Sequence, residues 1–223
     1  MTITALVAGI AFAVIGAGAE RLASVWPPDE ASHRKPGPRT ALLALAAGVV
    51  GGAIAWRASL PWYALLAHLL ILAILVLLTA TDLEQRRLPH LLLDPLIVVA
   101  ALFVPFNPTV SWSDALIGAA VAVGFMGLLG LLVRGGVALG DLYLVGPIGL
   151  VLGWPAIFVA IFVAGLLSAV VSALLLVTRR AGLKTYIPFG PFLVAGMVVT
   201  LLRDPALLGL VAGMLTGGRL TLT

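Results

Sequence analysis

Long apolar runs follow one another along most of the chain, and they restrict its fold more than any other feature. Each run approaches the length that a helix needs to cross a bilayer. Only 10% of the 223 residues are charged and 62% are hydrophobic. In soluble domains about a quarter of the residues are charged. Helices satisfy their own backbone polar groups in lipid. The sequence therefore predicts an all-α fold, a polytopic transmembrane helical bundle.

About eight spans are expected, and all of residues 1–223 should form a single integral-membrane domain. A weak hydrophobic tail that ends near Leu215 would be a ninth span. The expected spans cover residues 3–26, 41–56, 60–80, 91–106, 115–133, 142–153, a longer segment that turns at Trp154-Pro155 and ends near residue 177, and 192–202.

Basic residues are concentrated in alternate connections between these spans. One side of the predicted bundle collects Arg34, Lys35, Arg39, Arg86, Arg87, Arg134, Arg179, Arg180 and Lys184, and the other collects only Arg57 and Arg203. The positive-inside rule makes the first side cytoplasmic, places the N-terminus outside and makes residues 27–40 a cytoplasmic linker. The net charge of +4 is explained in this way without a nucleic-acid partner.

The chain contains no cysteine. This excludes a disulfide framework, a thiolate zinc site and a cysteine nucleophile. No metal or other cofactor is expected from the remaining residues.

Two carboxylates stand beside apolar spans on the predicted cytoplasmic side. Asp82 directly follows one span and Asp141 directly precedes another, so residues 82–90 and 134–141 are candidate catalytic loops. Acidic residues at such positions are costly and are often functional. Two carboxyl groups within about 3–5 Å of each other cannot both be ionised. They therefore share one proton. One can then activate water while the other protonates a peptide carbonyl oxygen and the leaving nitrogen.

Glycines before Asp141 would allow close backbone approach to the Asp82 helix and leave room for an extended substrate. They are Gly135, Gly136 and Gly140. The alternative is that both acids are unrelated helix caps, and spacing alone does not separate the two interpretations. Asp94, which precedes Pro95, is expected to be such a cap.

Three ordered segments resemble the type 4 prepilin leader peptidases, a family of Gly-x-Gly-Asp aspartyl proteases. They are Asp82-Leu-Glu-Gln-Arg-Arg-Leu-Pro-His90, Ala138-Leu-Gly-Asp141 followed by Leu-Gly-Trp154, and Ile187-Pro-Phe-Gly-Pro-Phe192. The resemblance covers nearly the whole chain after residue 41. It implies that Asp82 and Asp141 are the catalytic pair, with Ala138, Gly140, Pro89, Pro188 and Gly190 in substrate-binding or structural support.

The resemblance also implies a substrate and a location. The substrate would be a type IV prepilin-like or pseudopilin precursor that has a basic leader and a hydrophobic helix. Cleavage would take place at the cytoplasmic face of a bacterial inner membrane, in pilus assembly or protein secretion.

The chain departs from the family pattern at three residues and in one connection. Ala138 replaces a glycine, Tyr143 stands where relatives usually have lysine, and His90 replaces asparagine. Larger relatives carry a Cys-x-x-Cys zinc domain between their first two spans, where this chain has only residues 27–40. The resemblance therefore implies a short form, and N-methylation of the new terminus is left open.

Two other functions remain as alternatives. The departures would fit a catalytically degenerate relative that serves as an assembly component of a pilus or secretion machine. A small proton-coupled transporter ranks last, because the acids lie at span ends and no internal repeat is evident.

Overall fold

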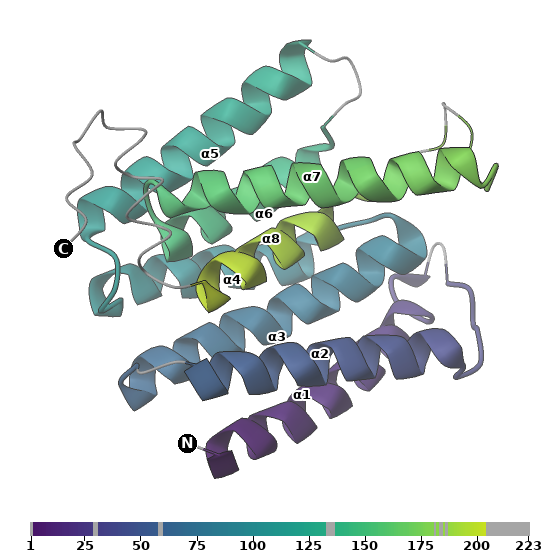
Figure 1. The fold of residues 1–223 in the computed structure, drawn as a ribbon, viewed down its shortest axis with the longest axis horizontal. Helices are drawn as coiled ribbons and strands as arrows, with labels where there is room; N and C mark the ends of the chain where they lie inside the picture. Colours follow the sequence, from purple (N-terminus) through teal and green to yellow (C-terminus); the bar gives the residue numbers. More distant parts are fainter. Residues whose placement is uncertain are drawn as a thin grey trace.

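The computed structural model describes residues 2–28, 31–57, 60–132, 137–180, 182, 185 and 187–203. These residues form helices and no strand, so the expected all-α fold is confirmed (Figure 1). The helices are α1 (Thr2–Ala23), α2 (Pro38–Arg57), α3 (Trp62–Gln85), α4 (His90–Phe103) with the short 3₁₀ helix η2 (Val104–Phe106), α5 (Trp112–Leu132), α6 (Leu139–Leu152), α7 (Ala156–Val177) and α8 (Gly190–Leu202). The proposed ninth span lies outside the described residues.

The helices fall into two length classes. Helices α1, α2, α3, α5 and α7 are long and apolar enough to cross a membrane. Helices α4, α6 and α8 have only 14, 14 and 13 residues. At the helical rise, 14 residues extend about 21 Å, which is less than the roughly 30 Å of a bilayer core. The eight apolar segments are therefore present, but three of them are too short to span alone.

The short helices form the interior of the bundle. Helix α6 packs against α4, α5 and α8, and α8 also contacts α3 and α7. Their buried faces meet in one apolar cluster that includes Leu78, Leu93, Leu144, Ile148 and Leu193. The long helices carry most of the exposed apolar side chains, such as Ile10, Leu131 and Phe162, and α4 adds Leu91 and Leu102. This distribution fits an outer surface in contact with lipid.

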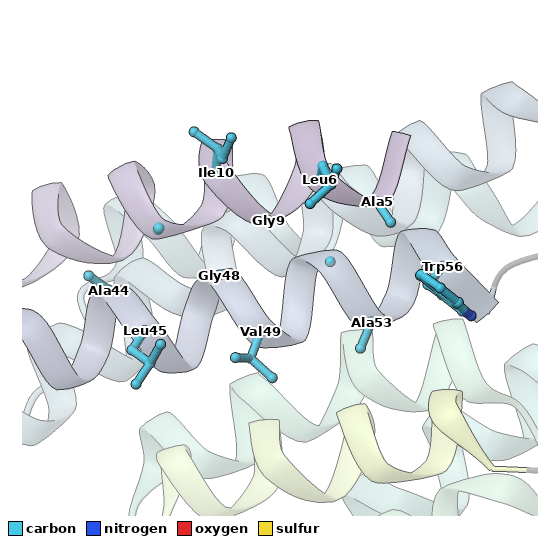
Figure 2. Close-up of a pocket in the computed structure, with 12 residues that line it drawn as sticks. Ala5, Leu6, Gly9, Ile10, Ala44, Leu45, Gly48, Val49, Ala53 and Trp56 are labelled. Atoms are coloured by element: carbon cyan, nitrogen blue, oxygen red, sulfur yellow. The ribbon is translucent and has the colours of Figure 1, made fainter. Parts of the chain in front are cut away.

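Helices α1 and α2 form a hairpin along one side of α3 (Figure 1). Glycines allow the two backbones to approach closely, as in other membrane helix pairs. A Cβ atom on Gly16 would lie 2.6 Å from the carbonyl oxygen of Leu43. The hairpin leaves an apolar hollow of about 900 Å³ between side chains such as Leu6, Ile10 and Val49 (Figure 2). None of the expected site residues lines it.

Helix α3 is longer than its apolar run. It continues five residues past Ala80 to Gln85, because Asp82 to Gln85 contains neither glycine nor proline. Arg86 then adopts a left-handed conformation with φ 53°, and its N–H bonds to the carbonyl oxygen of Asp82 over 2.9 Å. Asp82 consequently belongs to the last turn of α3, and only the residues after Gln85 form a loop.

Candidate functional site

Asp82 is held in the last turn of α3 and is only 3% exposed. Its Oδ2 accepts a hydrogen bond from the backbone N–H of Gly190 over 3.1 Å. Gly190 is the first residue of α8. N–H groups in the first turn of a helix have no partner within that helix, so a carboxylate is a favourable acceptor for them. Asp82 therefore lies at the point where the end of α3 meets the start of α8.

Asp141 lies in the first turn of α6 and is also 3% exposed. Its Oδ2 accepts a hydrogen bond from the N–H of Ala138, the residue before the helix, over 3.4 Å. This contact fixes the carboxylate against its own helix start. The residues expected to form the loop before Asp141 are only partly described, because 133–136 lie outside the described residues, and Leu139 to Asp141 are already helical.

The two carboxyl groups are brought together from different helices. Asp82 and Asp141 are close enough for direct electrostatic interaction. Leu144, one turn beyond Asp141, lies within 3.5 Å of the position of a Cβ atom on Gly190. Helices α3, α6 and α8 thus converge on one buried point. The two acids therefore interact, while the shared proton and the catalytic role stay predictions.

Two glycines at this point lie in tight contacts that a side chain would disturb. A Cβ on Gly190 would lie 2.6 Å from Oδ2 of Asp82. A Cβ on Gly140 would lie 3.1 Å from the side chain of Leu88, which belongs to the loop after α3. Both expected support glycines therefore lie at close contacts between the segments that carry the acids. Gly135 and Gly136 lie outside the described residues.

The two support prolines precede helices. Pro89 stands immediately before α4 with φ −68° and ψ 134°, an extended conformation that favours a helix start at the next residue. Pro188 is half-buried in the non-helical stretch that leads to Gly190. Both lie in connections that run to the buried carboxylates.

The three departures from the family pattern have simple structural settings. Ala138 has φ −78° and ψ 149°, which any residue can adopt, so glycine is not required there. The rings of His90 and Tyr143 contact each other edge to face, with centroids 5.0 Å apart. The two substituted side chains therefore form a pair that joins the start of α4 to the second turn of α6.

The expectation that Asp94 caps a helix is wrong. Helix α4 begins at His90, so Asp94 and Pro95 lie inside it. The Asp-Pro pair and the earlier Pro89 are competing start signals, and the helix uses the earlier one. Asp94 is exposed, and its Oδ1 lies 3.5 Å from Nδ1 of His90.

Residues 24–40 make contacts that sequence reasoning missed. The sequence indicated a cytoplasmic linker over residues 27–40, whereas the described part of that linker, together with the end of α1, binds the end of α3. The side chain of Gln85 donates hydrogen bonds to the carbonyl oxygens of Ala23 and Pro27 over 2.8 and 3.1 Å. A polar Glu20 near the end of an apolar span was the available signal, because such a side chain needs a partner.

Across the parts of the chain that the structure describes, no group of three or more His, Asp or Glu side chains is arranged to hold a metal ion. The polar chemistry of the site rests on the two carboxylates and the backbone N–H groups around them. These features define a multi-pass helical membrane protein with a buried pair of carboxylates at one end of its bundle.

Comparisons with known proteins identify the family. Residues 69–173 match the model of the type IV leader peptidase family. A prepilin leader peptidase/N-methyltransferase of Stutzerimonas stutzeri is 33% identical over 74% of this chain and 59% of that protein. Proteins with the same name from Pseudomonas aeruginosa and Bacillus subtilis are 32% and 29% identical over 75% and 66% of this chain, and over 60% and 59% of their own lengths. The chain belongs to the type IV leader peptidase family.

The chain spans about three fifths of the length of these relatives. The matched region contains both Asp82 and Asp141. No solved structure matches the chain.

Proposed function

We propose that this protein is a membrane aspartic endopeptidase that removes the leader from type IV prepilin-like precursors, with Asp82 and Asp141 as the catalytic pair. One observation carries the proposal: two buried carboxyl groups from α3 and α6 interact at the point where α8 begins. A structural cap would not need a second buried acid opposite it, since each buried charge raises the cost of the other.

The pair can perform peptide hydrolysis without any other group. Sharing one proton, it offers a base and an acid at once. The ionised carboxylate takes a proton from water as the water oxygen attacks the scissile carbonyl carbon. The protonated carboxyl group donates to the carbonyl oxygen, and the pair later protonates the leaving nitrogen as the C–N bond breaks.

We further propose that the end of the bundle that holds the pair faces the cytoplasm. The ends of α1, α3, α5 and α7 and the starts of α2, α4, α6 and α8 share this end, because the chain passes back and forth between the two ends. Described basic residues at this end are Arg21, Arg34, Lys35, Arg39, Arg86, Arg87, Arg179 and Arg180. The positive-inside rule then places the N-terminus outside.

Cleavage of a precursor tests the activity. The chain is expressed in membranes with a prepilin-like precursor, and loss of the leader is followed by mass. Asp82→Asn and Asp141→Asn should each lower the rate at least about 10³-fold, because neither variant can share the proton. Asp94→Asn is the matched control, since Asp94 is an exposed carboxylate in the neighbouring helix, and it should cleave at the wild-type rate.

Either of two results would contradict the proposal. Cleavage by the Asp82→Asn or Asp141→Asn variant at the wild-type rate would show that the two acids are not the catalytic pair. A wild-type protein that co-purifies with pilus components but cleaves no precursor would instead favour the degenerate assembly component, for which the substituted His90 and Tyr143 are the supporting observation.

A further inference from the structure

The segment between α1 and α2 together with the first residues of α2, residues 24–40, is tied to the turn of α3 that carries Asp82. We call these residues the strap; Asp29 and Glu30 within it lie outside the described residues. Three strap contacts reach Glu84, two positions after Asp82, and two of them are short. Ser32 Oγ donates to Glu84 Oε1 over 2.6 Å, and Arg34 Nη2 lies 3.0 Å from Glu84 Oε2. The strap is therefore anchored next to the proposed site.

Arg34 extends the same connection to α1. Its guanidinium also pairs with Glu20, in the last turn of α1, and Thr40 Oγ1 donates to the other oxygen of Glu20 over 2.7 Å. Arg21 in turn donates to the carbonyl oxygen of Arg34. One side chain thus bridges two acids that come from two helices.

The two acids depend on this bridge, because they are largely removed from water. The side chains of Glu20 and Glu84 are 7% and 10% exposed, and that of Arg34 is 31% exposed. Removal of one member of such a group leaves uncompensated charge in a poorly solvated place. Arg39 makes a useful contrast, since it approaches the same Glu84 only to 3.7 Å and is 73% exposed. An exposed pair of that kind contributes little.

The last turn of α3 is held from two sides, because Gly190 donates to Asp82 and the strap contacts Glu84 and Gln85. It ends at Arg86 in the left-handed conformation, and terminal turns open more easily than helix interiors. Gln85 and Glu84 carry the strap contacts, and both are within one turn of Asp82. Whatever holds this turn also sets the position of Asp82 relative to Asp141.

We propose that Arg34 is a positioning residue for the reaction: by bridging Glu20 and Glu84 it locks the strap onto α3 and keeps Asp82 in place opposite Asp141. The inference rests on the proposed peptidase function, and it adds a site for that function outside the family's motif segments. Arg34 touches neither acid of the pair and acts through Glu84.

Two measurements on the same variants test the proposal. The first is the cleavage rate of a prepilin-like precursor by wild type, Arg34→Met and Arg39→Met in membranes. Arg34→Met should lower kcat at least about ten-fold with little change in KM, because small displacements of a reacting group mainly slow the chemical step. Arg39→Met should leave both parameters within about two-fold of wild type, as an exposed pair predicts.

The second measurement does not depend on activity. Because the chain contains no cysteine, an Ala80→Cys substitution introduces a single thiol. Ala80 is buried in the seam between α3 and the α1–α2 hairpin. The introduced thiol should react with N-ethylmaleimide several-fold faster when Arg34→Met is also present than in the otherwise wild-type chain. Arg39→Met should leave this rate unchanged. Arg34→Lys, which keeps the charge but not the planar guanidinium, should give a rate between those of wild type and Arg34→Met.

The outcomes separate the two proposals. Unchanged labelling and unchanged kcat in Arg34→Met would overturn the role of Arg34, and so would faster labelling with an unchanged kcat. If Arg34→Met does not accumulate in membranes, the Arg34→Lys variant supplies the same comparison. A wild-type protein that cleaves no precursor would defeat the proposed function, while the labelling rates would still test whether the strap holds α3.

Discussion

The backbone N–H of Gly190 donates a hydrogen bond to the carboxylate of Asp82, although the two residues are 108 positions apart. The same glycine has no space for a side chain, because a Cβ would lie 2.6 Å from that carboxylate oxygen. The start of α8 thus forms one wall of the proposed site.

Gly190→Ala should reduce activity without unfolding the protein. The obstructing atom is the end of a side chain, so the Asp82 carboxylate can move while the backbone stays in place. A misplacement of about 1 Å costs on the order of 10²-fold in rate. We expect such a fall in kcat for precursor cleavage, with a nearly unchanged melting temperature. Gly124→Ala is the control, since nothing lies within 4 Å of its Cβ position. Full activity in Gly190→Ala would show that the carboxylate has room elsewhere.

The edge-to-face contact between His90 and Tyr143 should be energetically coupled. Aromatic pairs of this kind contribute about 0.5–1.5 kcal/mol beyond simple burial, although both rings are partly exposed. A double-mutant cycle with His90→Ala and Tyr143→Ala should give an interaction free energy of unfolding at the lower end of that range. Tyr143→Phe should keep the contact. Additive effects of the two alanine substitutions would mean that the rings touch without stabilising the site.

The proposed sidedness can be tested with single thiols in the cysteine-free chain. Lys35 is exposed on the strap, and Ser113 is exposed at the start of α5, at the other end of the bundle. In intact cells, a membrane-impermeant maleimide should label Ser113→Cys but reach Lys35→Cys only after the membrane is opened. The opposite pattern would place the carboxylate pair on the outer face.

The sequence predicts much of this fold because apolar runs report directly on helices in lipid. All the expected spans up to residue 202 contain helices, and the two acids expected on one side of the bundle, Asp82 and Asp141, interact electrostatically. Helix ends are less predictable, since local signals compete. The Asp94-Pro95 pair has the form of a cap, yet α4 starts at His90, after Pro89.

Contacts between distant segments are what the sequence could not supply. The hydrogen bond from Gly190 to Asp82 and the bridge from Arg34 to Glu84 join residues that no local pattern relates. The proline-rich composition of residues 27–40 is typical of a solvated linker. Its polar groups instead satisfy buried acids at the ends of α1 and α3, and only the packed fold brings these groups together.

Close packing between α7 and α8 provides a last prediction, on stability. A Cβ on Gly196 would lie 2.1 Å from the carbonyl oxygen of Ala160 in α7. Here the obstruction is backbone, so Gly196→Ala must push α8 away from α7, with a cost of about 1–3 kcal/mol. The melting temperature in detergent should fall by several degrees. Activity should fall with it, because α8 carries Gly190.

Gly165→Ala in α7 is the matched control for this prediction. Gly165 is exposed, and nothing lies within 4 Å of its Cβ position. The substitution should therefore leave the melting temperature unchanged or raise it, since alanine favours a helix interior over glycine by up to about 1 kcal/mol. Equal melting temperatures for Gly196→Ala and Gly165→Ala would mean that α7 and α8 can separate freely, and α8 could then not act as a fixed wall beside Asp82.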